Sequence, residues 1–191
     1  MTILVAEIDY YPENLWADAD ARAFDSSGAR WWCLHTKPRQ EKAVARALRE
    51  AERSFYLPQI FSDHRTPQGR RIRSLIPLFP SYVFLLGDDH DRVRAIQCNR
   101  LVGVLPVFDQ RALDQDLSRI HTILGSGLSL APEPKALPGM LVRVTSGPLA
   151  GLEGTVVRRG KGDHFIAMVR FLSRGASVEL QDWQVEPIGE S

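Results

Sequence analysis

Residues 31–53 read WWCLHTKPRQEKAVARALREAER, and their pattern predicts how the first half of the chain folds. Its first five residues form a β-rich run, which ends at the Lys-Pro pair of residues 37–38. Beyond the proline, apolar side chains recur with the i, i+3, i+4, i+7 spacing of an amphipathic helix, at Val44, Ala47, Leu48 and Ala51. A strand followed by a helix over about residues 39–53 is therefore predicted.

The chain after this helix continues the same kind of domain. A strand broken by a proline covers residues 55–61, a turn follows at 66–69, and the return arm of a hairpin starts at Arg70. Residues 82–86 (YVFLL) are the most apolar run and predict a central strand. A short helix at 89–98, buried through Val93 and Ile96, a strand at 101–107 and a helix ending at 124 complete the pattern.

Without the hairpin, the predicted order is strand, helix, strand, strand, helix, strand. This is the split βαβ, or ferredoxin-like, order, in which helices back a small antiparallel sheet. We therefore expect an α+β chain whose first domain covers residues 31–124. The last helix carries a 3.6-residue apolar period at Leu113, Leu117, Ile120 and Leu124.

The C-terminal third has a different sequence pattern, without helical periodicity. Residues 125–138 (GSGLSLAPEPKALP) show no period and contain three prolines, so they predict a linker. Short strands separated by glycine-rich turns follow over 139–189 and favour a small closed SH3-like β-barrel over a sandwich. The expected core of this barrel consists of Val142, Val144, Val156, Ile166, Val169, Val178 and Val185.

The first 30 residues form a predicted flexible leader without periodicity. The exception is residues 10–16 (YYPENLW), which hold three aromatic rings. We favour a strap that docks on the chain's own folded domain over a peptide that binds a partner.

Composition excludes several classes of protein. The formal charge of the 191 residues is only +1, but residues 31–124 carry 15 basic and 10 acidic side chains, so attraction to nucleic acid should lie there. No apolar run approaches the roughly 20 residues of a membrane helix, and the N-terminus is unlike a secretion signal. Two cysteines, Cys33 and Cys98, form no disulfide framework and indicate buried thiols in a reducing cytoplasm.

No catalytic or cofactor site is predicted. Cys33 and His35 share one face of a strand, but a thiol nucleophile also needs an orienting group and an oxyanion hole, and neither is flagged. The five histidines are dispersed without zinc spacing. The glycine-rich run at 147–154 lacks the Lys and helix of a phosphate loop. We expect a protein that is not an enzyme and holds no metal or cofactor.

Two surfaces are candidates for binding. Four arginines cluster on the hairpin and offer salt-dependent attraction to phosphates, although a solubilising surface is an equal alternative: Arg65, Arg70, Arg71 and Arg73. The Phe79-Pro80-Ser81-Tyr82 segment enters the central strand and is suited to anchor a partner helix. The alternative is that both rings fill the core.

These segments resemble the NusG/Spt5 family of transcription elongation factors. The runs WWCLHTKPRQEKAVARAL, LFPSYVFL and LVGVLP resemble the family's N-terminal domain, and GMLVRVTSGPLAGLEGTVV and FLSRGASVELQDWQVEPI resemble its KOW domain. The resemblance covers about residues 31–189 in family order, with 125–138 as the linker. The compact run at 55–85 is closer to the specialised paralogues typified by RfaH than to the general factor.

The resemblance implies a partner for each domain. The N-terminal domain would grip the clamp helices of the largest subunit of RNA polymerase through an apolar depression lined by His35, Phe79, Pro80 and Tyr82. The KOW domain would recruit a small-subunit ribosomal protein or the termination factor Rho through Phe171, Leu172 and Arg174. The hairpin arginines would face DNA without sequence specificity, and the protein would act as a cytoplasmic monomer.

The expected function is that of a transcription elongation or antitermination factor, which bridges the polymerase cleft and reduces pausing. The alternative is an RNA- or ribosome-binding KOW module that does not act on RNA polymerase. The two differ at the Phe79-Pro80 pair, which a polymerase factor needs exposed and an RNA binder does not.

Overall fold

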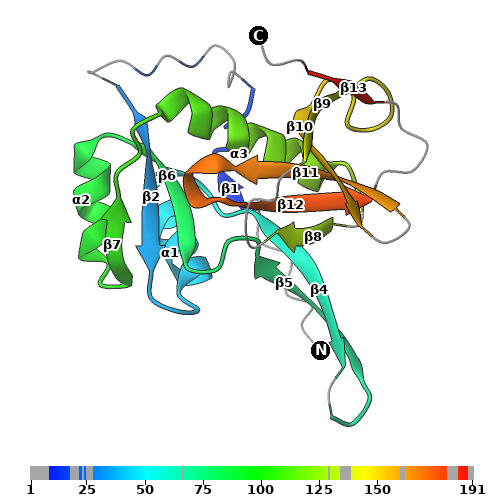
Figure 1. The fold of residues 1–191 in the computed structure, drawn as a ribbon. Coiled ribbons are helices and arrows are strands. Elements are labelled where there is room, and N and C mark those ends of the chain that lie inside the picture. The colour runs from blue at the N-terminus through cyan, green and yellow to red at the C-terminus, as the bar shows by residue number, and fades with distance from the viewer. Residues whose placement is uncertain are drawn as a thin grey trace. The chain divides into compact units, whose positions relative to one another are not determined.

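The computed structural model describes residues 9–17, 22, 24, 28–65, 67–128, 130–133, 139–159, 162–179 and 185–188 (Figure 1). The chain forms two compact units, Met1–Gln110 and Arg111–Ser191. Each unit has its own antiparallel sheet and its own buried side chains. The combination of helices with antiparallel sheets that the sequence predicts is therefore confirmed.

The first unit is built on a five-stranded antiparallel sheet with the order β1-β3-β6-β2-β7. Without β1 and the β4–β5 hairpin, its elements follow the predicted order of strand, helix, strand, strand, helix, strand. Along the chain the elements are β1 (Tyr10–Tyr11), β2 (Arg30–Thr36), α1 (Glu41–Glu50), β3 (Ser54–Tyr56), β4 (Gln59–Arg65), β5 (Arg71–Pro77), β6 (Tyr82–Gly87), α2 (Asp89–Gln97) and β7 (Leu101–Leu105).

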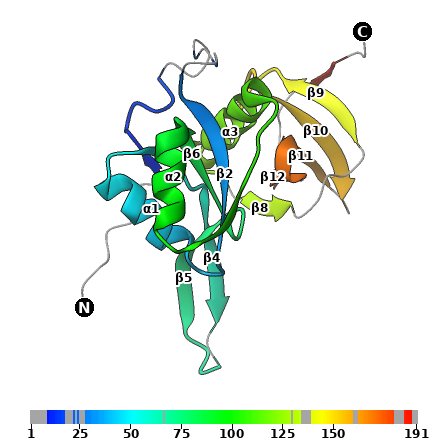
Figure 2. The ribbon, with the colours of Figure 1, turned by 90° about the vertical axis from the view of Figure 1, so that its left-hand side faces the viewer.

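Helices α1 and α2 cover one face of this sheet (Figure 2). The predicted stripe of α1 supplies Val44 and Leu48 to the core between them. The prediction for α2 is wrong in its details, because Val93 and Ile96 are 42% and 45% exposed and Ala95 is the buried residue. Helix α2 has too few apolar residues for their spacing to identify its buried face. In the structure Ala95 packs against the core of the sheet.

The aromatic leader segment docks on the first unit. Its strand β1 pairs with β3, which places Tyr10 opposite Tyr56. Leu15 is buried, and the Trp16 ring stacks on Trp31 with 6.1 Å between the ring centroids. The predicted strap over residues 10–16 is therefore confirmed in the described part of the leader.

Strands β4 and β5 form a separate two-stranded sheet that projects from the unit (Figures 1 and 2). The turn lies where the sequence predicts it, and Gly69 has a φ of +81°, a conformation that glycine adopts without steric cost. The backbone N–H of Leu78 donates to the carbonyl of Pro58 at 2.8 Å and closes the base of the hairpin.

The second unit contains a six-stranded antiparallel sheet with the order β13-β9-β10-β11-β12-β8. Five of the seven predicted core residues are buried, while Val156 and Val185 are half-buried. Phe165 is also buried, although it was not among the predicted core residues. The elements are α3 (Gln110–Gly125), β8 (Leu130–Glu133), β9 (Met140–Val144), β10 (Glu153–Arg159), β11 (Gly162–Val169), the 3-10 helix η1 (Arg170–Leu172), β12 (Arg174–Glu179) and β13 (Val185–Pro187).

Two features of the second unit differ from expectation. The predicted linker 125–138 contains strand β8, which pairs with β12 and places Leu130 opposite Val178. Helix α3, expected in the first domain, groups from Arg111 onward with the second unit. The domain bounds of the sequence analysis stay a prediction, but residues 130–133 belong to a sheet.

Candidate functional site

The Phe79–Tyr82 segment is a tight turn at the start of β6. The N–H of Tyr82 donates to the Phe79 carbonyl at 3.1 Å, and Ser81 has a φ of +71°. Proline followed by a residue with positive φ is the pattern of a type II turn. Ser81 occupies the position that glycine favours, so the surrounding structure must hold it there.

A buried carboxylate holds this turn in place. Glu41, at the start of α1, is 6% exposed, and its Oε1 accepts a hydrogen bond from the N–H of Ser81 at 2.7 Å. The Ser81 carbonyl in turn accepts from the N–H of Thr36 at 2.9 Å. The turn is therefore fixed to both α1 and β2. Glu41 has no signal in the sequence, because a tertiary contact and no local motif gives it this role.

Three of the four predicted contact residues are accessible at this turn. His35 and Tyr82 lie opposite each other on β2 and β6, and their half-buried rings stack with centroids 5.3 Å apart. Pro80 is exposed. Phe79 is only 1% exposed and packs edge-on against Phe84, so the exposure that the polymerase interpretation requires is met at Pro80 and not at Phe79.

The neighbouring thiol lacks the properties of a nucleophile. Cys33 lies on β2 and is completely buried, and burial raises the pKa of its thiol to about 12. A nucleophilic cysteine needs a thiolate near neutral pH and some access for its substrate. Cys33 has neither and acts as a small apolar core residue.

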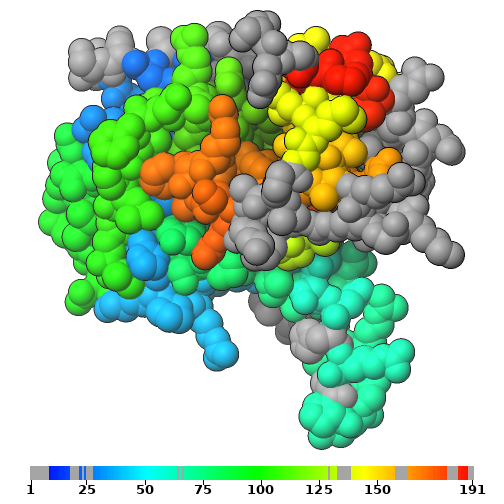
Figure 3. Space-filling model, in the orientation of Figure 1, coloured from blue at the N-terminus to red at the C-terminus, as the bar shows by residue number. Residues whose placement is uncertain are grey.

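The predicted arginines all lie on the β4–β5 hairpin and are exposed. Figure 3 shows this hairpin as a projecting element. Arg71 pairs with Asp63 through a contact of 2.7 Å. The Arg73 guanidinium lies over the ring of Phe61, 3.9 Å from its centroid. Arg65 stands opposite Arg71 in the strand pairing. The structure therefore gathers these arginines on one small element, together with an exposed aromatic ring that the sequence analysis did not single out.

The predicted contact loop of the second unit follows β11. Phe171, Leu172 and Arg174 are half-buried, and Ser173 between them has a φ of +51°. The preceding residue anchors the loop, because Asp116 on α3 accepts from the Arg170 N–H at 2.9 Å and from its guanidinium at 3.1 Å. Asp116 is 1% exposed. Neither partner of this contact carries a signal in the sequence.

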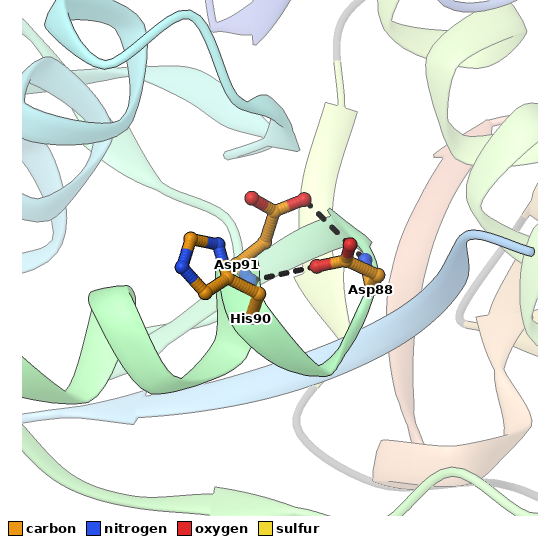
Figure 4. A group of neighbouring side chains, drawn as sticks. All are labelled: Asp88, His90 and Asp91. Atoms are coloured by element: carbon orange, nitrogen blue, oxygen red, sulfur yellow. Dashed lines mark hydrogen bonds between the residues drawn. The ribbon is translucent and has the colours of Figure 1, made fainter.

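One cluster of the described residues meets the geometry for a metal ion. Ligand atoms of Asp88, His90 and Asp91 lie within 4.8 Å of one another at the start of α2 (Figure 4). Asp88 and Asp91 form the capping box of this helix, and the N–H of Asp91 holds the pKa of the Asp88 carboxyl below its usual value. Asp91 also pairs with Arg53 at 3.1 Å. Helix capping accounts for this arrangement.

No helix within the described ranges combines the length and the apolar character that crossing a bilayer requires.

Most of the chain is similar in sequence to known proteins. The family model described as transcription termination factor nusG matches residues 29–132, which excludes most of the leader. The transcription termination/antitermination protein NusG of Pseudomonas aeruginosa is 30% identical over 181 residues, covering 83% of this chain and 98% of that protein. The protein of the same name from Vibrio cholerae is 28% identical over 182 residues and is covered to 96%.

A solved structure titled "Domain interaction in Thermotoga maritima NusG" is also similar, with a TM-score of 0.45 and 18% identity. It covers 86% of this chain and 100% of that one. The match of the family model spans more than half of the 191 residues, and relatives named for termination and antitermination of transcription are covered nearly from end to end. The chain therefore belongs to the NusG family.

Proposed function

We propose that this protein is a transcription elongation and antitermination factor that binds RNA polymerase across its cleft and reduces pausing. The observation that carries the proposal is the surface of His35, Pro80 and Tyr82, held by the Glu41-supported turn, in a chain of the NusG family. Stacked aromatic rings beside an exposed proline are an anchor for a partner helix. That helix would belong to the clamp of the largest polymerase subunit.

In this proposal the protein does no chemistry of its own. Bridging the cleft makes an open clamp less favourable, so paused states become less populated. The first unit would be a ferredoxin-like domain and the second an SH3-like KOW barrel. No metal or cofactor is needed for this role, which takes place in the cytoplasm with the protein as a monomer.

Each of the other surfaces has a place in the proposal. The hairpin arginines Arg65, Arg70, Arg71 and Arg73 would face DNA beside the polymerase. The loop with Phe171, Leu172 and Arg174 would contact a small-subunit ribosomal protein or Rho. The protein would be a specialised factor of the RfaH type, and its action on templates with and without a recruiting DNA element tests this subdivision.

The direct test is the affinity of the full chain for core RNA polymerase. Replacing both His35 and Tyr82 by alanine removes the accessible rings and should weaken binding by at least tenfold, since anchor residues dominate such interfaces. Phe108→Ala is the matched control, because Phe108 is 92% exposed and lies outside the proposed surface. Unchanged affinity of a folded His35/Tyr82 double variant rules the assignment out.

The exposed arginine hairpin favours a second candidate function, an RNA- or ribosome-binding module. That module would bind ribosomal RNA or ribosomal subunits at least as tightly as it binds polymerase. Titrating the full chain against core polymerase and against small ribosomal subunits distinguishes the two functions. Binding to polymerase that depends on His35 and Tyr82 supports the first function, and binding to ribosomal subunits alone supports the second.

A further inference from the structure

Helices α1 and α2 lie side by side on the sheet of the first unit (Figure 2). A pocket of about 350 Å³, open at its mouth, lies between them, and we call it the α1–α2 pocket. One wall is formed by Val44, Ala47 and Leu48 of α1, and the other by Ala95 of α2 and by Cys98 directly after it. A pocket of this size that combines apolar walls with a few polar groups is typical of sites for small molecules.

Arg53 lines the pocket and is held in place by the end of α1. Its N–H donates to the carbonyl of Leu48 at 2.8 Å, and the N–H of Glu52 donates to the carbonyl of Arg49 at 2.9 Å. Glu52 has a φ of +54°, so these bonds form a Schellman motif, which fixes the course of the chain after a helix. The Nη1 of Arg53 lies 3.1 Å from Oδ1 of Asp91 on α2. The Arg53 guanidinium is therefore fixed from both helices.

Two guanidinium groups at the pocket can still donate to an acceptor. The Nε of Arg53 is buried, and it has no hydrogen-bond partner among the described residues. A buried donor without an acceptor is unfavourable, and an oxygen atom of a ligand would remove this cost. Arg94, which also lines the pocket, is exposed and forms no ion pair within the part of the chain that the structure describes.

The charges around the pocket favour an anionic ligand. Its described lining includes two arginines and one aspartate, which leaves a formal charge of +1. The Asp91 side chain is only 14% exposed, pairs with Arg53 and belongs to the capping box of α2, so its carboxylate is already engaged. The surplus positive charge therefore lies on Arg94. Guanidinium groups form charge-assisted hydrogen bonds with carboxylates, which indicates the acidic group that the ligand would carry.

We propose that the α1–α2 pocket binds a small apolar carboxylate, a short-chain carboxylic acid, with its chain between the two helices and its carboxylate on Arg53 and Arg94. The small side chains of Ala47 and Ala95 leave the space that the chain would fill. The pocket is separate from the proposed polymerase surface. Helix α1 packs on the face of β2 that carries Leu34, whereas neighbouring residues of a strand, such as His35, point to the opposite face. The proposal therefore does not depend on the proposed function.

The thiol of Cys98 provides the readout, because it lines the pocket and is half-buried. Cys33 does not interfere, since it is completely buried and burial raises the pKa of its thiol to about 12. Mass spectrometry of the full chain gives the rate at which iodoacetamide alkylates Cys98 as hexanoate is added at constant ionic strength. Hexanoate should slow this reaction. Hexanol, which has the chain without the charge, should protect only at higher concentration, and hexylamine should not protect.

Two pairs of variants separate the chain from the charge. Ala47→Leu fills the pocket and should remove the effect of hexanoate, whereas Ala43→Leu, the same change one turn earlier and outside the pocket, should keep it. Arg94→Gln should raise the hexanoate concentration for half-protection about fivefold, as loss of an exposed ion pair does. Arg70→Gln, at an exposed arginine of the hairpin, should leave that concentration unchanged.

Three results would overturn the proposal. The first is an alkylation rate that hexanoate does not change. The second is equal protection by hexanoate, hexanol and hexylamine, which would show that the charge of the ligand is irrelevant. The third is protection that persists in Ala47→Leu, which would place the ligand outside the α1–α2 pocket.

Discussion

Ser81 shows how a single hydrogen bond can determine the shape of a contact surface. Its positive φ is unfavourable for a residue with a side chain, and the buried carboxylate of Glu41 accepts its N–H. Glu41→Ala removes this acceptor, so we expect a loss of about 1–2 kcal/mol in the free energy of unfolding. Glu41→Gln keeps an acceptor oxygen and should retain most of the stability.

Urea denaturation of both variants measures this difference. Glu50→Ala is the control, because Glu50 is an exposed glutamate at the other end of the same helix. Equal losses for Glu41→Ala and Glu41→Gln would show that the hydrogen bond to Ser81 is unimportant.

Phe79 stabilises the first unit from within. Its side chain is 1% exposed and meets the Phe84 ring edge-on, with centroids 6.1 Å apart. Phe79→Ala should therefore cost about 3–5 kcal/mol, as removal of a buried phenylalanine typically does. Near-UV circular dichroism during urea denaturation measures the cost. If the Phe79→Ala variant were as stable as the parent protein, Phe79 would not stabilise the core of the first unit.

At the scale of elements, the docked strap carries a titratable group. Burial raises the pKa of Asp9 to about 6 from 3.8, against the opposing effects of backbone hydrogen bonds and the charge of Arg49. Between about pH 4 and pH 6 the docked strap thus binds more protons than the undocked one. Docking should weaken as the pH rises through this window, by at most about 3 kcal/mol.

Hydrogen exchange at Leu57 reports this docking, because its N–H donates to the carbonyl of Asp9 at 2.6 Å. After correction for the intrinsic rate, protection should be higher at pH 5 than at pH 7. Asp9→Asn is neutral at both values and should show no such difference. A pH dependence that survives in Asp9→Asn would assign the effect to another group.

The elements with strong periodicity could be predicted, and those defined by pairing could not. The helical spacing of Val44 and Leu48 in α1 and the turn residues of the hairpin are encoded locally, and the helix and the return strand β5 both form where expected. Strand β8 has no such signal, since its sequence LAPE contains a proline and its partner β12 lies more than 40 residues further along the chain. Its existence depends on an open sheet edge that a local pattern does not reveal.

For the candidate site, too, the residue types within one run of sequence could be predicted, whereas the tertiary contacts could not. The Phe79–Tyr82 segment and the hairpin arginines are visible as residue types in one run of sequence. Whether an aromatic residue is an anchor or a core residue depends on packing, which residue types in a run do not reveal. Phe79 is buried, whereas Phe61, which has no signal in the sequence, is 56% exposed. Glu41 and Asp116 act through tertiary contacts that have no local spacing.

At the scale of the whole molecule, we propose that this chain binds RNA polymerase through His35, Pro80 and Tyr82 and thereby reduces pausing. The most direct measurement is the lifetime of a paused complex in single-round transcription, with the full chain and with the His35→Ala/Tyr82→Ala variant. The parent protein should shorten the pause, and the variant should leave it at the lifetime seen without any factor. The claim would be contradicted if the folded variant shortened the pause as much as the parent, or if the parent had no effect at concentrations that saturate the polymerase.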